Sequence, residues 1–127
     1  GKRILLAEDN ELNAEIAMEL LKEEGFLIDW VKDGQECFDK LEESDEGYYD
    51  LILMDIQMPI LNGYNTAAKI RQMENQKKAA TPIVAMTANS FDEDIERTKK
   101  AGMNGFIAKP LDSEKMFTIL KQNIEKN

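Results

Sequence analysis

The sequence Leu51-Ile52-Leu53-Met54, which ends at Asp55, is the stretch that decides the fold. Four consecutive large apolar residues indicate a strand that is covered on both faces, as the strands of a parallel sheet are. Similar apolar runs occur at 4–7 and 83–86. We therefore expect three central strands in one parallel sheet.

Two weaker strands and five helices complete the pattern. The segment 27–31 contains the charged Asp29 and the segment 106–108 is short, so both are expected at the edges of the sheet. A helix is predicted after each strand: the first ends at Gly25, and the others lie at about 35–43, 64–76, 91–101 and 113–125. This alternation predicts a single α/β domain over residues 1–127, with a doubly wound, flavodoxin-like (βα)5 sheet in the order 2-1-3-4-5.

Several side chains are assigned to packing or capping. The first helix is expected to bury an apolar stripe that consists of Leu12, Ile16, Leu20, Ala17 and Leu21. Asn10 or Asn13 can cap this helix, because Asn is favoured at the N-cap. Trp30 and Cys37 are interpreted as packing residues.

The composition excludes several kinds of chemistry. The 127 residues contain no histidine, which removes imidazole general bases, Ser-His nucleophile pairs and imidazole metal sites. A single cysteine removes intrachain disulfides and thiolate metal clusters. The net charge of -9 argues against nucleic acid or an anionic membrane surface as a partner. No apolar run approaches the roughly 20 residues that cross a bilayer, so a cytoplasmic location is predicted.

Polar residues gather where the predicted strands end. Ligands of doubly wound sheets bind beyond the carboxyl ends of the strands, at the point where the strand order reverses. Glu8 and Asp9 follow the first strand and Asp55 follows the third, on the two sides of that point. Thr87 and Lys109 follow the fourth and fifth strands. We expect these five side chains to converge on one rim of the sheet.

This set of residues suits a divalent cation and a phosphoryl group. Three crowded carboxylates repel one another, and Mg²⁺, which prefers oxygen ligands, relieves that repulsion; Mn²⁺ can substitute. A lysine and a hydroxyl beside the cation can hold a phosphoryl group. One carboxylate can then act as a nucleophile and form an aspartyl phosphate.

The chain resembles the receiver domain of two-component response regulators. It is most similar to the receivers of hybrid sensor histidine kinases, because Asn13 follows a Glu-Asp-Asn opening and Asn89 ends a Thr-Ala-Asn segment. The matching segments are 4–10, 54–59 with Gly63, 86–89 and 106–110.

The resemblance implies a role for each acidic residue. Asp55 is the implied phosphoacceptor. Asp9 is implied to bind Mg²⁺ directly, and Glu8 to bind it through water; Glu8 replaces the more usual Asp. The backbone carbonyl of Gln57 is implied to be a further metal ligand.

The resemblance also implies phosphoryl-binding and switch residues. Lys109 is implied to pair with Asp55 and then with a phosphoryl oxygen, while the Thr87 hydroxyl and the Ala88 backbone N–H bind the other oxygens. Thr87 and Phe106 are the implied switch pair. The peptide bond between Lys109 and Pro110 is implied to be cis.

Partners and function are likewise implied. A histidine kinase or histidine phosphotransfer domain is expected to donate the phosphoryl group, since this chain has no histidine. A downstream protein is expected at the face formed by the fourth helix, fifth strand and fifth helix. The domain is expected to be a signalling switch and not a turnover enzyme, with slow autodephosphorylation at most. It is expected to lie in the cytoplasm, either by itself or as the cytoplasmic part of a membrane-bound hybrid kinase.

Two alternatives compete with this function. A phosphohydrolase of the haloacid dehalogenase type needs a second acid two residues after its nucleophile, and Gln57 occupies that position here. A binding-only pseudo-receiver loses acceptor or metal residues, which this chain retains. Both alternatives are therefore disfavoured.

Overall fold

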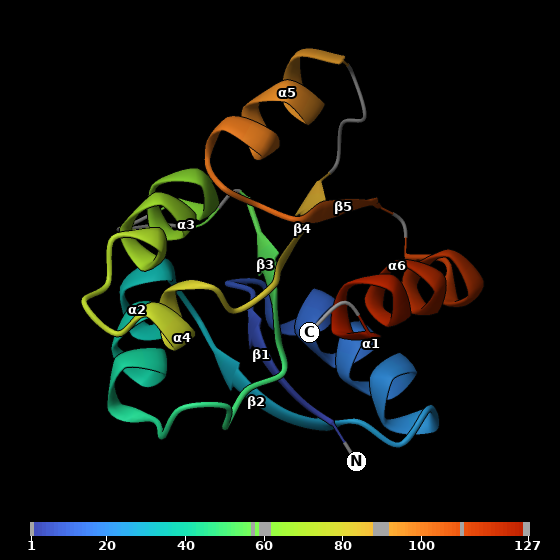
Figure 1. The fold of residues 1–127 in the computed structure, drawn as a ribbon. Coiled ribbons are helices and arrows are strands. Elements are labelled where there is room, and N and C mark those ends of the chain that lie inside the picture. Colours follow the sequence, from blue (N-terminus) through green and yellow to red (C-terminus); the bar gives the residue numbers. More distant parts are fainter. Residues whose placement is uncertain (1, 57, 59–61, 88–91, 110, 126–127) are drawn as a thin grey trace.

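One parallel sheet forms the centre of the molecule (Figure 1). The computed structural model describes residues 2–56, 58, 62–87, 92–109 and 111–125. The strands are β1 (Arg3–Ala7), β2 (Leu27–Val31), β3 (Leu51–Asp55), β4 (Ile83–Thr87) and β5 (Gly105–Ala108). Their order is β2-β1-β3-β4-β5, and every pair is parallel, as predicted.

Helices cover both faces of the sheet (Figure 1). They are α1 (Glu11–Glu23), α2 (Gly34–Glu43), α3 (Gly63–Arg71), α4 (Gln76–Ala79), α5 (Asp92–Lys100) and α6 (Ser113–Glu125). The structure thus has one short helix more than the sequence predicts. The face expected for downstream partners consists of α5, β5 and α6 in these labels. No helix in the described part of the chain is both long and apolar enough to cross a membrane.

The prediction of a single helix at 64–76 was wrong, because the structure has two helices in this region. The first helix of this region, α3, ends at Arg71, and the chain then turns at Gln72 with the buried Met73 pointing into the core. A new helix, α4, begins after Asn75, whose side chain accepts a hydrogen bond from the N–H of Lys78 at 3.1 Å. The N-cap at Asn75 and the burial of Met73 explain why the helix is interrupted.

Alternating strand residues build two hydrophobic cores. Leu5, Ile52 and Met54 point to the face that is covered by α2, α3 and α4. Leu6 and Leu53 point to the opposite face, which is covered by α1 and α6. Because β1, β3 and β4 are buried on both faces, their apolar runs are continuous, as expected for central parallel strands.

The predicted buried face of α1 was partly wrong. Leu12 and Ile16 are 65% and 45% exposed, although the stripe placed them in the core. The fully buried residues of the helix are Ala14, Ala17 and Leu21. Small alanines let α1 lie close to the sheet, which leaves the two larger apolar side chains at the surface.

Candidate functional site

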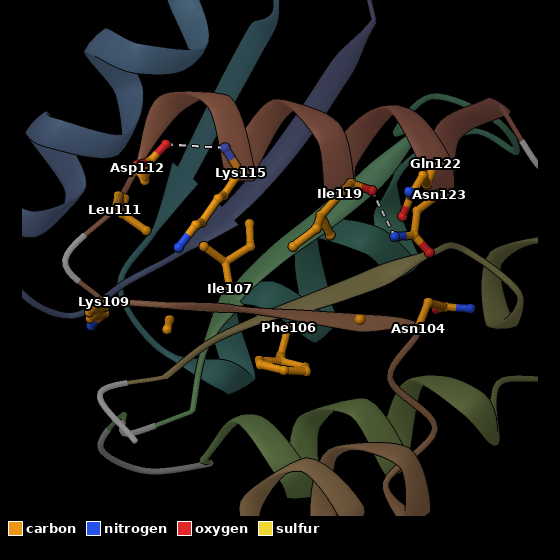
Figure 2. A pocket seen from close by; sticks show the side chains of 12 residues that line it. Asn104, Phe106, Ile107, Lys109, Leu111, Asp112, Lys115, Ile119, Gln122 and Asn123 are labelled. Carbon is orange, nitrogen blue, oxygen red and sulfur yellow. Dashed lines mark hydrogen bonds between the residues drawn. The ribbon is translucent and has the colours of Figure 1, made fainter. Parts of the chain in front are cut away.

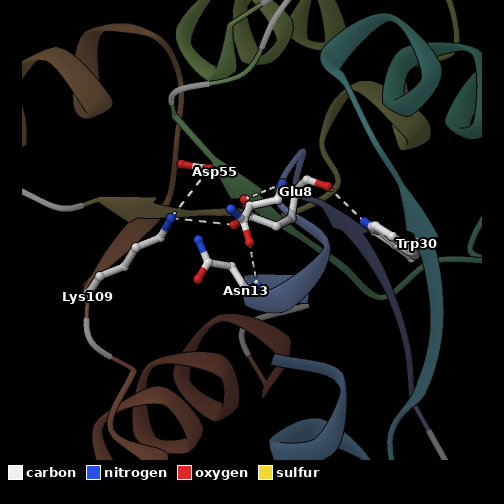
Figure 3. A network of polar contacts seen from close by, with 6 residues as sticks. Glu8, Asn13, Trp30, Asp55 and Lys109 are labelled. Atoms are coloured by element: carbon white, nitrogen blue, oxygen red, sulfur yellow. Dashed lines mark hydrogen bonds and ion pairs between the residues drawn. The ribbon is translucent and has the colours of Figure 1, made fainter. Parts of the chain in front are cut away.

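The strand ends bring the predicted site residues to one rim of the sheet. Glu8 and Asp9 follow β1, and Asp55 is the last residue of β3. Thr87 ends β4, and Lys109 follows β5. Parallel strands in register end at the same edge, so this convergence follows from the topology. Figure 3 shows Glu8, Asp55 and Lys109 facing one another at this rim.

The ammonium group of Lys109 joins two of the acids. Its Nζ lies 3.4 Å from Asp55 Oδ2 and 3.4 Å from Glu8 Oε2. Both carboxylates are buried, with side chains 7% and 1% exposed, while the lysine side chain is 23% exposed. Because the acids are shielded from water, these ion pairs are screened less than surface pairs.

The surroundings of Glu8 raise the pKa of its carboxyl group. Burial of its carboxyl group, together with a hydrogen bond to Asp55 that favours the protonated acid, raises the pKa of Glu8 to about 7. The backbone N–H of Asn10 donates to Glu8 Oε1 at 3.1 Å, and this bond acts in the opposite direction. Glu8 therefore changes its charge near neutral pH. A cation bound beside it would favour the charged form.

Three carboxylates could hold a metal ion. Glu8, Asp9 and Asp55 each offer an oxygen atom, and these atoms lie within 4.8 Å of one another. Asp9 is exposed, while the other two are buried, so a bound ion would meet solvent on the side of Asp9. An all-oxygen set of carboxylates that keeps access to water fits Mg²⁺.

The backbone behind Asp55 is closely packed. The N–H of Gly63, the first residue of α3, donates to the carbonyl of Ile56 at 2.9 Å. A Cβ atom at position 63 would lie 2.7 Å from the Asp55 carbonyl oxygen and 2.8 Å from Ile56 Cα. Only glycine lets the start of α3 approach the end of β3 so closely.

Thr87 and Lys109 are tied to each other through the backbone. The N–H of Lys109 donates to the Thr87 carbonyl at 2.8 Å, which continues the β4–β5 ladder past the end of β5. Thr87 is buried. Phe106, two residues before the end of β5, is half-buried against the core under α2 and α3, whereas Ile107 points toward α6 (Figure 2).

Other predicted positions lie outside the described residues. They are Gln57, Ala88 and Pro110, and with Pro110 goes the peptide bond that is implied to be cis. Asn10 does cap α1, because its side chain accepts a hydrogen bond from the N–H of Asn13 at 3.0 Å.

One contact of the site was not predicted from the sequence. Trp30 Nε1 donates to the Glu8 carbonyl at 2.8 Å (Figure 3). A tryptophan whose N–H is buried usually finds an acceptor, and this rule was the only available signal. The sequence does not say which acceptor it finds.

Comparisons with known proteins agree with this geometry. The hybrid signal transduction histidine kinase I of Dictyostelium discoideum is 35% identical over 125 residues, which are 97% of this chain and 7% of that protein. The receiver domain of sensor histidine kinase PA1611 from Pseudomonas aeruginosa PAO1, solved with a magnesium ion in its active site cleft, is 37% identical, with a TM-score of 0.87 and 98% of each chain covered.

A third relative was solved with a partner. The co-crystal structure contains the Saccharomyces cerevisiae histidine phosphotransfer protein Ypd1 and the receiver domain of Ssk1. The matching chain is 29% identical, with a TM-score of 0.85, and the match covers 95% of this chain and 87% of that one.

The predicted similarity to receivers of hybrid kinases is confirmed. The family model of the response regulator receiver domain matches residues 4–121. This chain therefore belongs to the receiver domains of two-component signalling.

Proposed function

We propose that this receiver domain accepts a phosphoryl group on Asp55 from a phosphohistidine, in a reaction that depends on a divalent cation. The observation that carries the proposal is the position of Asp55: it is a buried carboxylate paired with Lys109 at 3.4 Å and adjacent to two further acids. Three carboxylates this close together repel one another, which a structural role does not require and a bound cation would relieve.

The residues present can perform the transfer. A carboxylate oxygen of Asp55 attacks phosphorus, so that one P–O bond forms while the P–N bond of the phosphohistidine breaks. The electron pair of that bond returns to the donor's imidazole nitrogen. Lys109, which pairs with the carboxylate before the reaction, can turn to a phosphoryl oxygen afterwards. We assign the Thr87 hydroxyl to another phosphoryl oxygen, because this residue ends the neighbouring strand.

Mg²⁺ would be held by Asp9 and Asp55, with Glu8 beside it. When bound, the ion neutralises negative charge on the carboxylates and the phosphoryl oxygens. The magnesium ion in the active site cleft of the Pseudomonas receiver supports this choice. Mn²⁺ suits the same oxygen ligands.

The phosphoacceptor is tested by labelling with a small phosphodonor such as acetyl phosphate. Wild-type protein should gain one phosphoryl group in Mg²⁺ and none in excess chelator, and mass spectrometry should locate it on Asp55. Asp55→Asn should not be labelled, whereas Asp45→Asn, which changes an exposed acid, should be labelled as the wild type is. Labelling of Asp55→Asn at the wild-type level would refute the assignment.

A phosphohistidine donor would dock along α1. This helix starts two residues after Asp9, and it presents the exposed Leu12 and Ile16 next to the site. These two side chains border a shallow groove that also includes Glu15, Met18, Glu19 and Lys22. The Ypd1 complex of the Ssk1 receiver supports a histidine phosphotransfer protein, or the related domain of a kinase, as this donor.

We assign the output to the face made of α5, β5 and α6. A groove of about 760 Å³ lies between β5 and α6, where Ile107 and Ile119 point toward one another (Figure 2). Phe106 lies on the opposite side of β5, so a change in its packing would move the strand that lines the groove. Thr87 and Phe106 are the proposed switch, and a downstream protein is the proposed partner.

We further propose that this domain is a switch with slow autodephosphorylation and not a turnover phosphohydrolase. The absence of an acid at position 57 supports this, because a second acid is what the hydrolase mechanism requires. The chain spans 5–14% of the length of eight curated histidine kinases that it matches. This small share supports a receiver within a larger hybrid kinase, and we place the domain in the cytoplasm.

A further inference from the structure

Trp30 makes a polar contact with the turn after β1 that carries Glu8 and Asp9. Packing of the ring alone does not require this contact. It is the only tryptophan of the chain. Its ring is half-buried against the core that α1 and α6 cover. Its indole N–H donates to the main-chain carbonyl of Glu8 at 2.8 Å (Figure 3). The contact therefore joins β2 to the turn that carries two of the candidate metal ligands.

The bond replaces one that the sheet would otherwise supply. β1 and β2 pair from Arg3 opposite Leu27 to Ala7 opposite Val31. One further backbone bond runs from the N–H of Glu8 to the Val31 carbonyl, at 3.1 Å. A parallel ladder would next join the Glu8 carbonyl to the N–H two residues after Val31.

That position is Asp33, where the chain has already turned into α2. Asp33 is the N-cap of this helix, and its side chain accepts a hydrogen bond from the N–H of Glu36 at 2.8 Å. The ladder therefore stops one bond short. The indole N–H of Trp30 satisfies the Glu8 carbonyl in its place.

This carbonyl sets the direction of the following residue. The Glu8 carbonyl and the Asp9 N–H belong to one planar peptide group, so fixing one fixes the other. The Glu8 side chain is held separately, by the N–H of Asn10 and by Lys109. Asp9 is exposed, and its direction depends on the peptide group that Trp30 holds.

We propose that Trp30 is a positioning residue for the divalent cation, because its indole N–H holds the peptide between Glu8 and Asp9 where both carboxylates can face the same ion. The inference rests on the proposed metal-dependent phosphoacceptor function. Loss of a hydrogen bond behind a metal ligand typically costs 10- to 100-fold in metal affinity. Trp30 bonds the main chain and not the carboxylate itself, so we place its effect at or below the lower end of that range. We expect about three- to tenfold in the Kd for Mg²⁺.

The test removes the N–H and keeps the ring. β-(3-Benzothienyl)alanine, incorporated at position 30 of the full chain, has the shape of tryptophan with sulfur in place of N–H. Its Kd for Mg²⁺, measured by calorimetry at a temperature where both proteins are fully folded in chelator, should rise three- to tenfold. Trp30→Phe should weaken Mg²⁺ binding at least as much.

A spectroscopic signal separates positioning from packing. The single indole ¹H–¹⁵N peak of the wild type should move during a Mg²⁺ titration, with the midpoint that calorimetry gives. Wild-type protein that binds no Mg²⁺ would overturn the proposed function and this inference together. Wild-type binding, with an unmoved indole peak and a Kd of the benzothienyl protein within twofold, would overturn the inference alone.

Discussion

Replacing Glu8 by glutamine should stabilise the metal-free protein at alkaline pH. The Glu8 carboxyl is 1% exposed, and burial beside Asp55 raises its pKa to about 7. In the unfolded chain it titrates near its ordinary value of 4.5. Between these pH values the folded state binds more protons than the unfolded state, so the free energy of unfolding falls as the pH rises. Glutamine keeps the shape and has no charge to bury.

The magnitude follows from these two pKa values. One pKa unit corresponds to 1.36 kcal/mol, so the contribution of Glu8 to stability is largest in acid and is lost as the pH passes about 7. Between pH 5 and pH 8 the wild type should lose about 2.5 kcal/mol more than Glu8→Gln. This value is an upper bound, because water and Lys109 can lower the cost of the charge.

Urea unfolding in chelator measures the difference directly. Wild type and Glu8→Gln are compared at pH 5 and pH 8, so that the other acids cancel in the comparison. Glu43→Gln is the matched control, since it removes the same charge from an exposed position. The wild-type and Glu8→Gln values should diverge with pH, and the control should follow the wild type.

Magnesium should narrow the gap in stability between Glu8→Gln and the wild type at pH 8. A ligand at 100 times its Kd stabilises the folded state by about 2.7 kcal/mol. Glu8→Gln, which lacks one of the three carboxylates, should gain less than the wild type. If the difference between wild type and Glu8→Gln in chelator is the same at pH 5 and pH 8, the reasoning about the buried charge is refuted.

Three further predictions concern the backbone, the switch and the donor. Gly63→Ala should lower the free energy of unfolding by about 1–3 kcal/mol in urea titrations, because the added Cβ meets the Asp55 carbonyl at 2.7 Å; an unchanged midpoint would contradict this packing. Thr87→Ala should still be phosphorylated but should not shift the amide NMR signals of β5; shifts like those of the wild type would exclude the switch. Leu12→Asp and Ile16→Asp should each slow phosphotransfer from a histidine phosphotransfer protein at least tenfold, while labelling by acetyl phosphate stays unchanged; equal slowing of both reactions would exclude docking on α1.

The sheet could be predicted because its strands have two buried faces. The runs at 4–7, 51–54 and 83–86 have no polar residue, and only strands covered on both sides combine such runs with alternating helices. Once the order is known, the site follows, because parallel strands end at one rim. The juxtaposition of Glu8, Asp55 and Lys109 was therefore predictable from topology alone.

The errors arise where local geometry, and not the apolar pattern, decides the structure. Periodicity assumes that apolar side chains are buried, and it fails where the surface itself is apolar, as at Leu12 and Ile16 on α1. It also does not detect the break between α3 and α4, which depends on a cap at Asn75. The contact of Trp30 depends on where β2 turns into α2, a detail of backbone geometry that residue types do not reveal.

The two rims of the sheet surround a half-buried cation with different partners. At the opposite rim, where the strands begin, the acceptors of the Arg71 guanidinium among the described residues are neutral: they include the carbonyls of Gly102 at 2.8 Å and Thr81 at 2.7 Å and the Asn104 side chain at 2.7 Å. These bonds tie α3 to the segments that precede β4 and β5.

At the other rim one ammonium group, that of Lys109, faces a cluster of three carboxylates. When all three are ionised, two negative charges are left without compensation. A divalent cation would cancel them, and without it a phosphoryl group would bring further negative charge to a site that is already anionic. Glu8, with a pKa of about 7, instead holds a proton that the cation would displace. The repulsion between carboxylates is thus concentrated at the rim where a bound cation can relieve it. At the opposite rim, the hydrogen bonds of Arg71 hold α3 to the sheet and do not depend on a cation.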